Sequence, residues 1–186
     1  RLEQMRATDP LIDALLDYFP ASGRTATRSI DAVSGYIDEQ KLEILFVLDT
    51  SGSMSGEPIE LLRESCRAIA ASLRPGDKVS MVQWDTQNTW DLAGYAVAGP
   101  NDPTLLDAID ALEAGGGTDL NGGLQSGYDL AQQTWDKDAL NRLVLISDGG
   151  ANAGITDIEL IADNAAYGGA DGIYLVGAGV DLQGTY

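Results

Sequence analysis

The chain has 186 residues, of which 44% are hydrophobic and 22% charged, a composition typical of one globular domain with a real core. Its 29 acidic and 11 basic residues give a formal charge of −18 at pH 7, which leaves no basic surface for nucleic acid or anionic membranes. Histidine is absent, and this excludes Ser-His and Cys-His catalysis as well as zinc sites with histidine ligands.

The first forty residues differ in pattern from the rest of the chain. Asp9, Pro10 and the apolar residues after them predict a short amphipathic helix that ends at Pro20. We therefore assign residues 1–40 to an N-terminal extension and residues 41–186 to one domain. The chain begins without an initiator Met, so an origin in a longer protein stays open, and its apolar runs of about five residues predict no membrane-inserted segment.

From residue 41 onward the pattern alternates between strands and helices. Residues 42–48 form a nearly continuous apolar run with Ile and Val, typical of a parallel strand that is covered on both faces. Pro58 then begins a helix whose apolar residues recur three and four positions apart, and residues 74–77 end it. The single cysteine, Cys66, lies on that apolar face, so we expect it to fill the core rather than to react.

Two further strands are predicted over residues 79–84 and 90–97. The polar link between them, residues 85–88, is so short that it indicates a hairpin and an antiparallel edge strand. Three tryptophans are expected to anchor the sheet to its helices, with a binding face as the alternative: Trp84, Trp90 and Trp135.

The second half of the chain continues the alternation. Asp102 and Pro103 mark the start of a helix, which ends before the glycine run 115–117. The remaining predicted elements are a helix over 120–135, a strand over 143–146, a helix over 156–166 and a strand over 173–176. This order predicts an α/β fold with a doubly wound, mostly parallel central sheet, one antiparallel edge strand and helices on both faces.

Polar side chains follow the predicted strands at the points where the strands end. Asp49, Ser51 and Ser53 come directly after the first strand, Asp148 follows the later central strand, and Thr118 follows the glycine run. Ligands of open α/β sheets bind beyond the carboxyl ends of the strands, so we expect these side chains to converge. They offer only carboxylate and hydroxyl oxygens, which select hard divalent cations; Mg²⁺ is the expected ion, with Mn²⁺ and Ca²⁺ as alternatives.

Three short motifs occur in a fixed order: Asp-Thr-Ser-Gly-Ser-Met from residue 49, Gly-Gly-Gly-Thr-Asp-Leu from residue 115, and Ile-Ser-Asp-Gly from residue 146. Together they resemble the von Willebrand factor type A domain, in its bacterial type, and its metal-ion-dependent adhesion site. The likeness covers about residues 41–180.

The resemblance implies a role for each matching residue. Ser51, Ser53 and Thr118 would bind the metal directly, Thr118 in the ligand-ready state, whereas Asp49 and Asp148 would act mainly through water. It also implies that the sixth ligand is a Glu or Asp carboxylate of a partner protein. A typical member continues with another helix and strand after residues 173–176, whereas this sequence stops at Tyr186. We expect either that the segment is part of a longer protein or that this edge of the sheet is completed otherwise.

Simpler interpretations stay open for single residues. Asp49 is also suited to an Asx turn and Thr118 to a helix cap. Asp119 is expected either to lie behind the metal ligands or to belong to a first helical turn, rather than to bind the metal itself. We expect a metal-dependent protein-binding module that is not an enzyme. The alternatives are a structural domain of a larger assembly with an unused metal site, and a magnesium-dependent phosphatase, which would place a second Asp where the chain has Ser51.

The Asp-rich, Lys-poor composition favours an extracytoplasmic or cell-surface location over the cytoplasm, although a soluble surface far from its isoelectric point explains it equally well.

Overall fold

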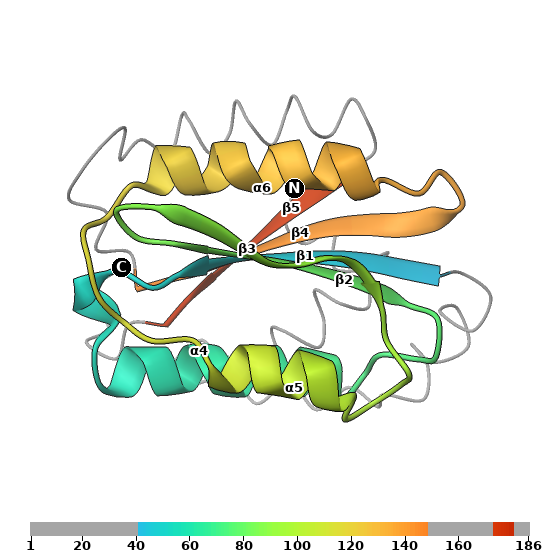
Figure 1. Cartoon of the computed structure of the whole chain (residues 1–186), viewed down its shortest axis with the longest axis horizontal. Coiled ribbons are helices and arrows are strands. Elements are labelled where there is room, and N and C mark those ends of the chain that lie inside the picture. Colours follow the sequence, from blue (N-terminus) through green and yellow to red (C-terminus); the bar gives the residue numbers. More distant parts are fainter. Residues whose placement is uncertain (1–40, 149–172, 181–186) are drawn as a thin grey trace, which may run out of the picture.

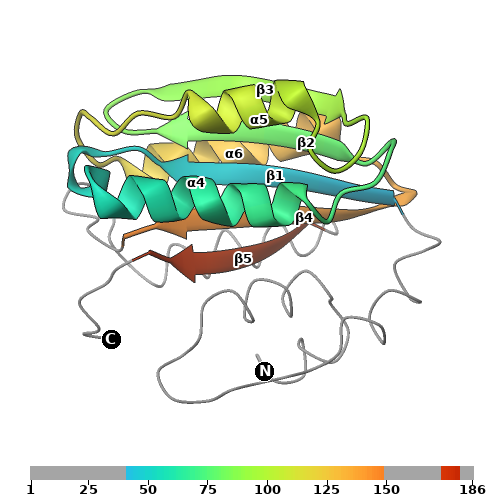
Figure 2. The same cartoon turned by 90° about the horizontal axis from the view of Figure 1, so that it is seen from below.

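The computed structural model describes residues 41–148 and 173–180, in which five strands form one sheet in the order β3-β2-β1-β4-β5 (Figure 2). The strands are β1 (Lys41–Asp49), β2 (Lys78–Trp84), β3 (Asn88–Ala96), β4 (Ala139–Ser147) and β5 (Ile173–Gly179). All neighbouring pairs are parallel except β2 and β3, which are antiparallel. The predicted mostly parallel sheet with one antiparallel edge strand is therefore confirmed.

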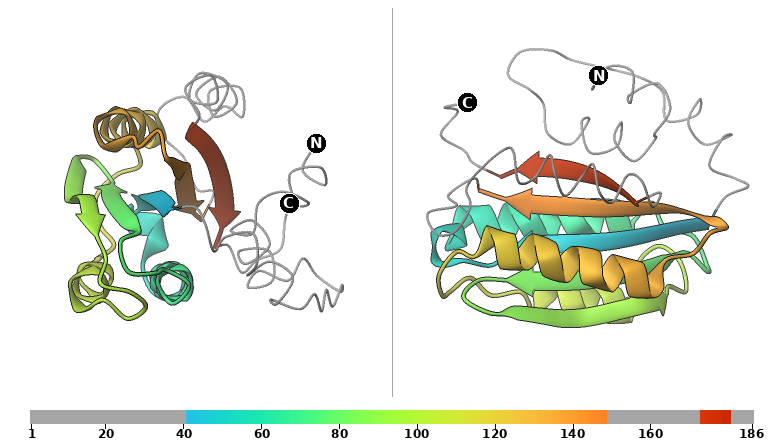
Figure 3. Two further views of the ribbon diagram at one scale, coloured as in Figure 1. Left: turned by 90° about the vertical axis from the view of Figure 1, so that its right-hand side faces the viewer. Right: turned by 90° about the horizontal axis from the view of Figure 1, so that it is seen from above.

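Helices cover both faces of this sheet. Helices α4 (Glu57–Ala70) and α5 (Pro103–Asp110) lie on one face, and α6 (Leu120–Thr134) lies on the other (Figures 1 and 3). The extension 1–40 and the predicted helix over 156–166 lie outside the described residues. Within residues 41–148 and 173–180, no helix combines the length and the apolar content needed to cross a bilayer.

Strand β1 is buried on both faces because its side chains alternate between two cores. Leu45 and Val47 pack with the residues under α6, whereas Phe46 and Leu48 belong to the core under α4 and α5. Cys66 lies in that second core, fully buried, and burial raises the pKa of its thiol. The prediction that Cys66 fills the core is confirmed.

Helix α6 approaches the sheet closely through two glycines on its inner face. A Cβ atom at Gly123 would lie 2.5 Å from Trp84 Cγ, and one at Gly127 would lie 2.5 Å from Val47 Cγ2. Real Cβ atoms do not come this near to other carbon atoms, so both positions require glycine at the present spacing of helix and sheet.

The expectation for the tryptophans is correct for one of the three. Trp84 is fully buried between β2 and α6, but Trp90 and Trp135 are 43% and 45% exposed. Trp90 lies on the edge strand β3, where its indole Nε1 donates a hydrogen bond to Ser126 Oγ of α6 at 2.7 Å. Trp135 is the C-cap of α6 and follows the last residue of the helix, Thr134.

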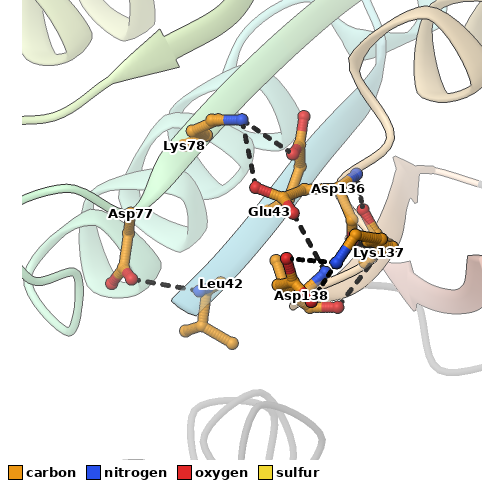
Figure 4. A network of polar contacts seen from close by, with 9 residues as sticks. Leu42, Glu43, Asp77, Lys78, Asp136, Lys137 and Asp138 are labelled. Atoms are coloured by element: carbon orange, nitrogen blue, oxygen red, sulfur yellow. Dashed lines mark hydrogen bonds and ion pairs between the residues drawn. The ribbon is translucent and has the colours of Figure 1, made fainter. Parts of the chain in front are cut away.

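A polar network ties the elements together at the amino ends of the parallel strands (Figure 4). Lys78 Nζ lies 3.3 Å from Asp136 Oδ2 and 3.8 Å from Glu43 Oε2. Glu43 is only 4% exposed, and its burial raises the pKa of its carboxyl group while Lys78 opposes the shift. At the start of β1, the Leu42 amide donates a hydrogen bond of 3.0 Å to Asp77 Oδ1.

Candidate functional site

Three of the predicted site residues lie in one tight turn at the end of β1, on the left side of Figure 1. The strand ends at Asp49, and the short 3-10 helix η1 (Gly52–Met54) follows within three residues. Ser51 Oγ and Ser53 Oγ lie 3.1 Å apart, so the two hydroxyl groups face the same point. The Ser51 amide donates a hydrogen bond of 2.9 Å to Asp49 Oδ1, which holds the turn closed.

Asp49 is fully buried and accepts hydrogen bonds from neutral donors on both carboxylate oxygens. Besides the Ser51 amide on Oδ1, Ser147 Oγ donates to Oδ2 at 2.6 Å. Burial raises the pKa of Asp49, the hydrogen bonds from Ser147 and Ser51 oppose the shift, and the charge of Asp148 raises it further. The like charge of Asp148 thus acts against ionisation of Asp49, and a divalent cation would relieve that repulsion.

Thr118 belongs to a second loop, which the backbone joins to the first. The Gly52 amide donates to the Gly116 carbonyl at 3.2 Å, and the Gly115 amide donates to the Thr50 carbonyl at 2.8 Å. Thr118 itself is half-buried and comes two residues after Gly116. The structure therefore brings the loop of Thr118 against the loop of Ser51 and Ser53.

The simpler interpretations of single residues have different outcomes. The hydrogen bond from the Ser51 amide makes Asp49 an Asx-turn residue, as that interpretation expects. The cap of α6 is not Thr118 but Asp119, whose Oδ1 accepts from the Gly122 amide at 2.9 Å. The alternative that Thr118 caps the helix is therefore wrong, and Asp119 is the N-cap of α6 rather than a residue of its first turn.

Other residues that shape the site were not singled out from the sequence. Ser147 orients Asp49, and its place directly before Asp148 at a strand end is a signal that could have identified it. Thr86, in the turn between β2 and β3, accepts a hydrogen bond of 2.6 Å from the Gly117 amide. No local pattern marks Thr86, because its partner is 31 residues away in the chain.

The donor set fits a hydroxyl-rich site for a hard cation. Within the described part of the chain, no three residues of the types His, Cys, Asp and Glu gather around one point. The hydroxyls of two serines and of a threonine on the adjoining loop, together with the carboxylates of Asp49 and Asp148, offer oxygen ligands alone, which Mg²⁺, Mn²⁺ and Ca²⁺ accept.

A family profile described as the von Willebrand factor type A domain matches residues 44–151, more than half of the chain. The chain belongs to the von Willebrand factor type A family. A sequence relative of this type A domain is the uncharacterized protein YfbK of Escherichia coli K12, 33% identical over 119 residues, which are 63% of this chain and 20% of that protein. Another is human inter-alpha-trypsin inhibitor heavy chain H1, 27% identical over 148 residues, or 75% of this chain and 16% of that protein. The type A domain thus spans a fifth or less of the length of these relatives.

Solved structures share the fold of this type A domain at low sequence identity. The protein BatB from Bacteroides thetaiotaomicron superimposes with a TM-score of 0.58 at 16% identity, covering 77% of this chain and 73% of that one. Manganese-loaded TRAP protein from Plasmodium vivax gives a TM-score of 0.57 at 17% identity, covering 78% and 60%. The type A fold of the chain is therefore shown by sequence and structure together.

Proposed function

We propose that the chain holds one divalent cation at its site loops and uses it to bind a carboxylate of a partner protein. Ser51, Ser53 and Thr118 would contact the ion directly, with Asp49 and Asp148 behind them. Mg²⁺ is the proposed ion, and Mn²⁺ and Ca²⁺ are the alternatives for the same oxygen ligands. The observation that carries this proposal is the 3.1 Å separation of the Ser51 and Ser53 hydroxyl oxygens beside a buried carboxylate.

The electrostatics of the site support a cation that mediates binding. Asp49 accepts hydrogen bonds from Ser51 and Ser147, which carry no charge, and the like charge of Asp148 acts on it. A chain of formal charge −18 repels acidic ligands, so an acidic partner needs a local positive charge to bind here. The bound ion would supply that charge. The manganese in the TRAP structure, which has the same fold, is in keeping with this proposal.

We propose binding rather than catalysis. A phosphoryl-transfer enzyme needs cationic side chains to neutralise the transferred group, but residues 79–136 contain neither Lys nor Arg. The site loops over 49–53, 115–119 and 147–148 contain none either. A phosphatase-like site would have to operate without them.

Calorimetric titration of the metal-stripped protein with Mg²⁺, Mn²⁺ and Ca²⁺ tests the ion site. We expect one saturable site, lost in Asp49→Asn, which keeps an acceptor for the Ser51 amide, and weakened at least about tenfold in Ser53→Ala. The matched control is Ser55→Ala, an exposed serine just beyond η1. Equal metal affinity in Ser53→Ala and Ser55→Ala would contradict the proposed ligands.

The carboxylate is tested separately with fluorescein-labelled peptides of Gly and Ser that carry one central Glu. Their fluorescence anisotropy should rise with protein in the presence of metal and stay low in the presence of EDTA. A peptide with Gln in place of Glu is the control, because it removes the charge and keeps the shape. Equal binding of the Glu and Gln peptides would contradict a carboxylate ligand.

A further inference from the structure

A polar groove of about 320 Å³ opens beside the candidate metal loops. Two of the residues that border it, Thr50 and Gly116, belong to the loops of Ser51 and Thr118. The other wall is the hairpin of β2 and β3, which contributes hydroxyl and amide side chains such as Gln83 and Thr89. A ligand that reaches the proposed ion can therefore continue into this groove.

Asp85 is the one charged residue among the described residues that line the groove. Its Oδ1 accepts a hydrogen bond of 2.7 Å from the Gln87 amide, which holds the side chain against the turn. Its Oδ2 lies next to Gly116, since a Cβ atom added to Gly116 would be 2.9 Å from that oxygen. The turn thus fixes one negative charge in the wall between the hairpin and the loop of Thr118.

No basic residue of the same segment offsets this charge, since residues 79–136 contain neither Lys nor Arg. The groove lining is mostly polar, so it offers little to an apolar side chain. The negative charge of Asp85 therefore favours a cationic group in the groove through charge complementarity.

We propose that the groove binds a Lys or Arg side chain of the partner, within about four residues of the carboxylate that the ion holds. An extended chain advances about 3.3–3.6 Å per residue, so a few residues are enough to pass from the metal loops into a groove that borders them. This inference rests on the proposed function and adds the chemistry of the partner: a segment with an acidic and a basic residue close together.

The test uses the same labelled Glu peptides, with Arg placed one to four residues to either side of Glu, and matched peptides with Gln at the Arg position. Affinities are measured by anisotropy with metal for the unaltered protein, Asp85→Asn and Asp129→Asn. Asparagine at position 85 still offers Oδ1 to the Gln87 amide, so the turn is kept. Asp129 is an exposed carboxylate of α6 outside the groove lining, and its substitution changes the net charge equally.

We expect one or more Arg positions to improve metal-dependent binding about 3- to 10-fold over Gln. The improvement should vanish in Asp85→Asn and persist in Asp129→Asn. Equal affinity of all Arg and Gln peptides, with metal-dependent binding intact, would overturn the groove inference alone. An Arg preference that is unchanged in Asp85→Asn would overturn it too. Absence of metal-dependent binding for every Glu peptide would overturn both the groove inference and the proposed function.

Discussion

The Gly52 amide donates a hydrogen bond of 3.2 Å to the carbonyl of Gly116, and this bond joins the two loops that carry the candidate metal ligands. Gly116 has a φ of 74°, a backbone conformation that other L residues rarely adopt. The geometry of the proposed site thus depends on a glycine that contributes no side chain to it.

Replacing Gly116 with alanine is expected to displace the loop of Thr118. The new Cβ atom would lie 2.8 Å from Asp85 Cγ, and the positive φ adds strain of about 1–2 kcal/mol. We expect a folded protein whose affinity for the divalent cation falls about tenfold, measured by calorimetric titration. Gly115→Ala is the control, because a Cβ atom there meets nothing within 4 Å. An equal loss of cation affinity in Gly116→Ala and Gly115→Ala would contradict the explanation by the crowded, positive-φ position of Gly116.

The close packing of α6 against the sheet predicts whether a second substitution, Gly127→Ala, raises or lowers the free energy of unfolding. Alanine is favoured over glycine in helices by about 1 kcal/mol, but at Gly127 its Cβ atom would lie 2.5 Å from Val47 Cγ2. We therefore expect Gly127→Ala to destabilise the protein by about 1–3 kcal/mol in urea unfolding. Gly177→Ala in β5, where a Cβ atom meets nothing within 4 Å, should change the free energy of unfolding little. A gain in stability for Gly127→Ala would show that α6 can move away at no cost.

The network in Figure 4 predicts different effects for two lysines. Lys78→Met removes the cation that lies between Glu43 and Asp136, and it leaves the buried Glu43 carboxyl group without its ion pair. We expect a loss of about 1–2 kcal/mol in the free energy of unfolding, since Lys78 itself is partly exposed. Lys137→Met breaks an exposed pair with Asp138 and should cost less than about 0.5 kcal/mol. Equal losses of unfolding free energy in the two variants would mean that the burial of Glu43 does not make its ion pair with Lys78 more important for stability.

Asp102 predicts a pH dependence of stability. The Ala98 amide, the amides of Leu105 and Thr104 at the start of α5, and the Tyr95 hydroxyl donate hydrogen bonds to its carboxylate, and these hydrogen bonds lower its pKa. The folded state therefore binds this proton less readily than the unfolded state. The stabilisation is present above the ordinary Asp pKa of 3.8 and is lost as the pH falls through the lowered value.

The measurement for Asp102 is urea unfolding of the protein and of Asp102→Asn from pH 7 down to pH 3. We expect Asp102→Asn to be less stable at pH 7, because its amide nitrogen cannot accept the bonds that Oδ2 accepts from Ala98 and Tyr95. The difference between the two proteins should shrink as the pH falls. A difference that stays constant across this range would contradict a lowered pKa of Asp102.

Residue pattern was sufficient for the order and type of the described strands and α-helices, but not for the 3-10 helix η1. The apolar run 42–48 corresponds to β1, because a strand between two helical layers must be apolar on both faces. The hairpin of β2 and β3 followed from the short link between them. The residues after the strands could be named as a candidate site, since parallel strands present their carboxyl ends at one edge of a sheet.

The exposure of side chains and the hydrogen-bond partners of the site residues could be determined only from the folded structure. Trp90 and Trp135 are as apolar as Trp84, but their exposure depends on where the edge strand lies and where α6 ends. Asp49 and Ser147 are 98 residues apart in the chain, and no spacing rule predicts that their side chains meet. Local patterns record which face of an element is buried, whereas contacts between distant loops depend on how the whole sheet brings the ends of its strands together.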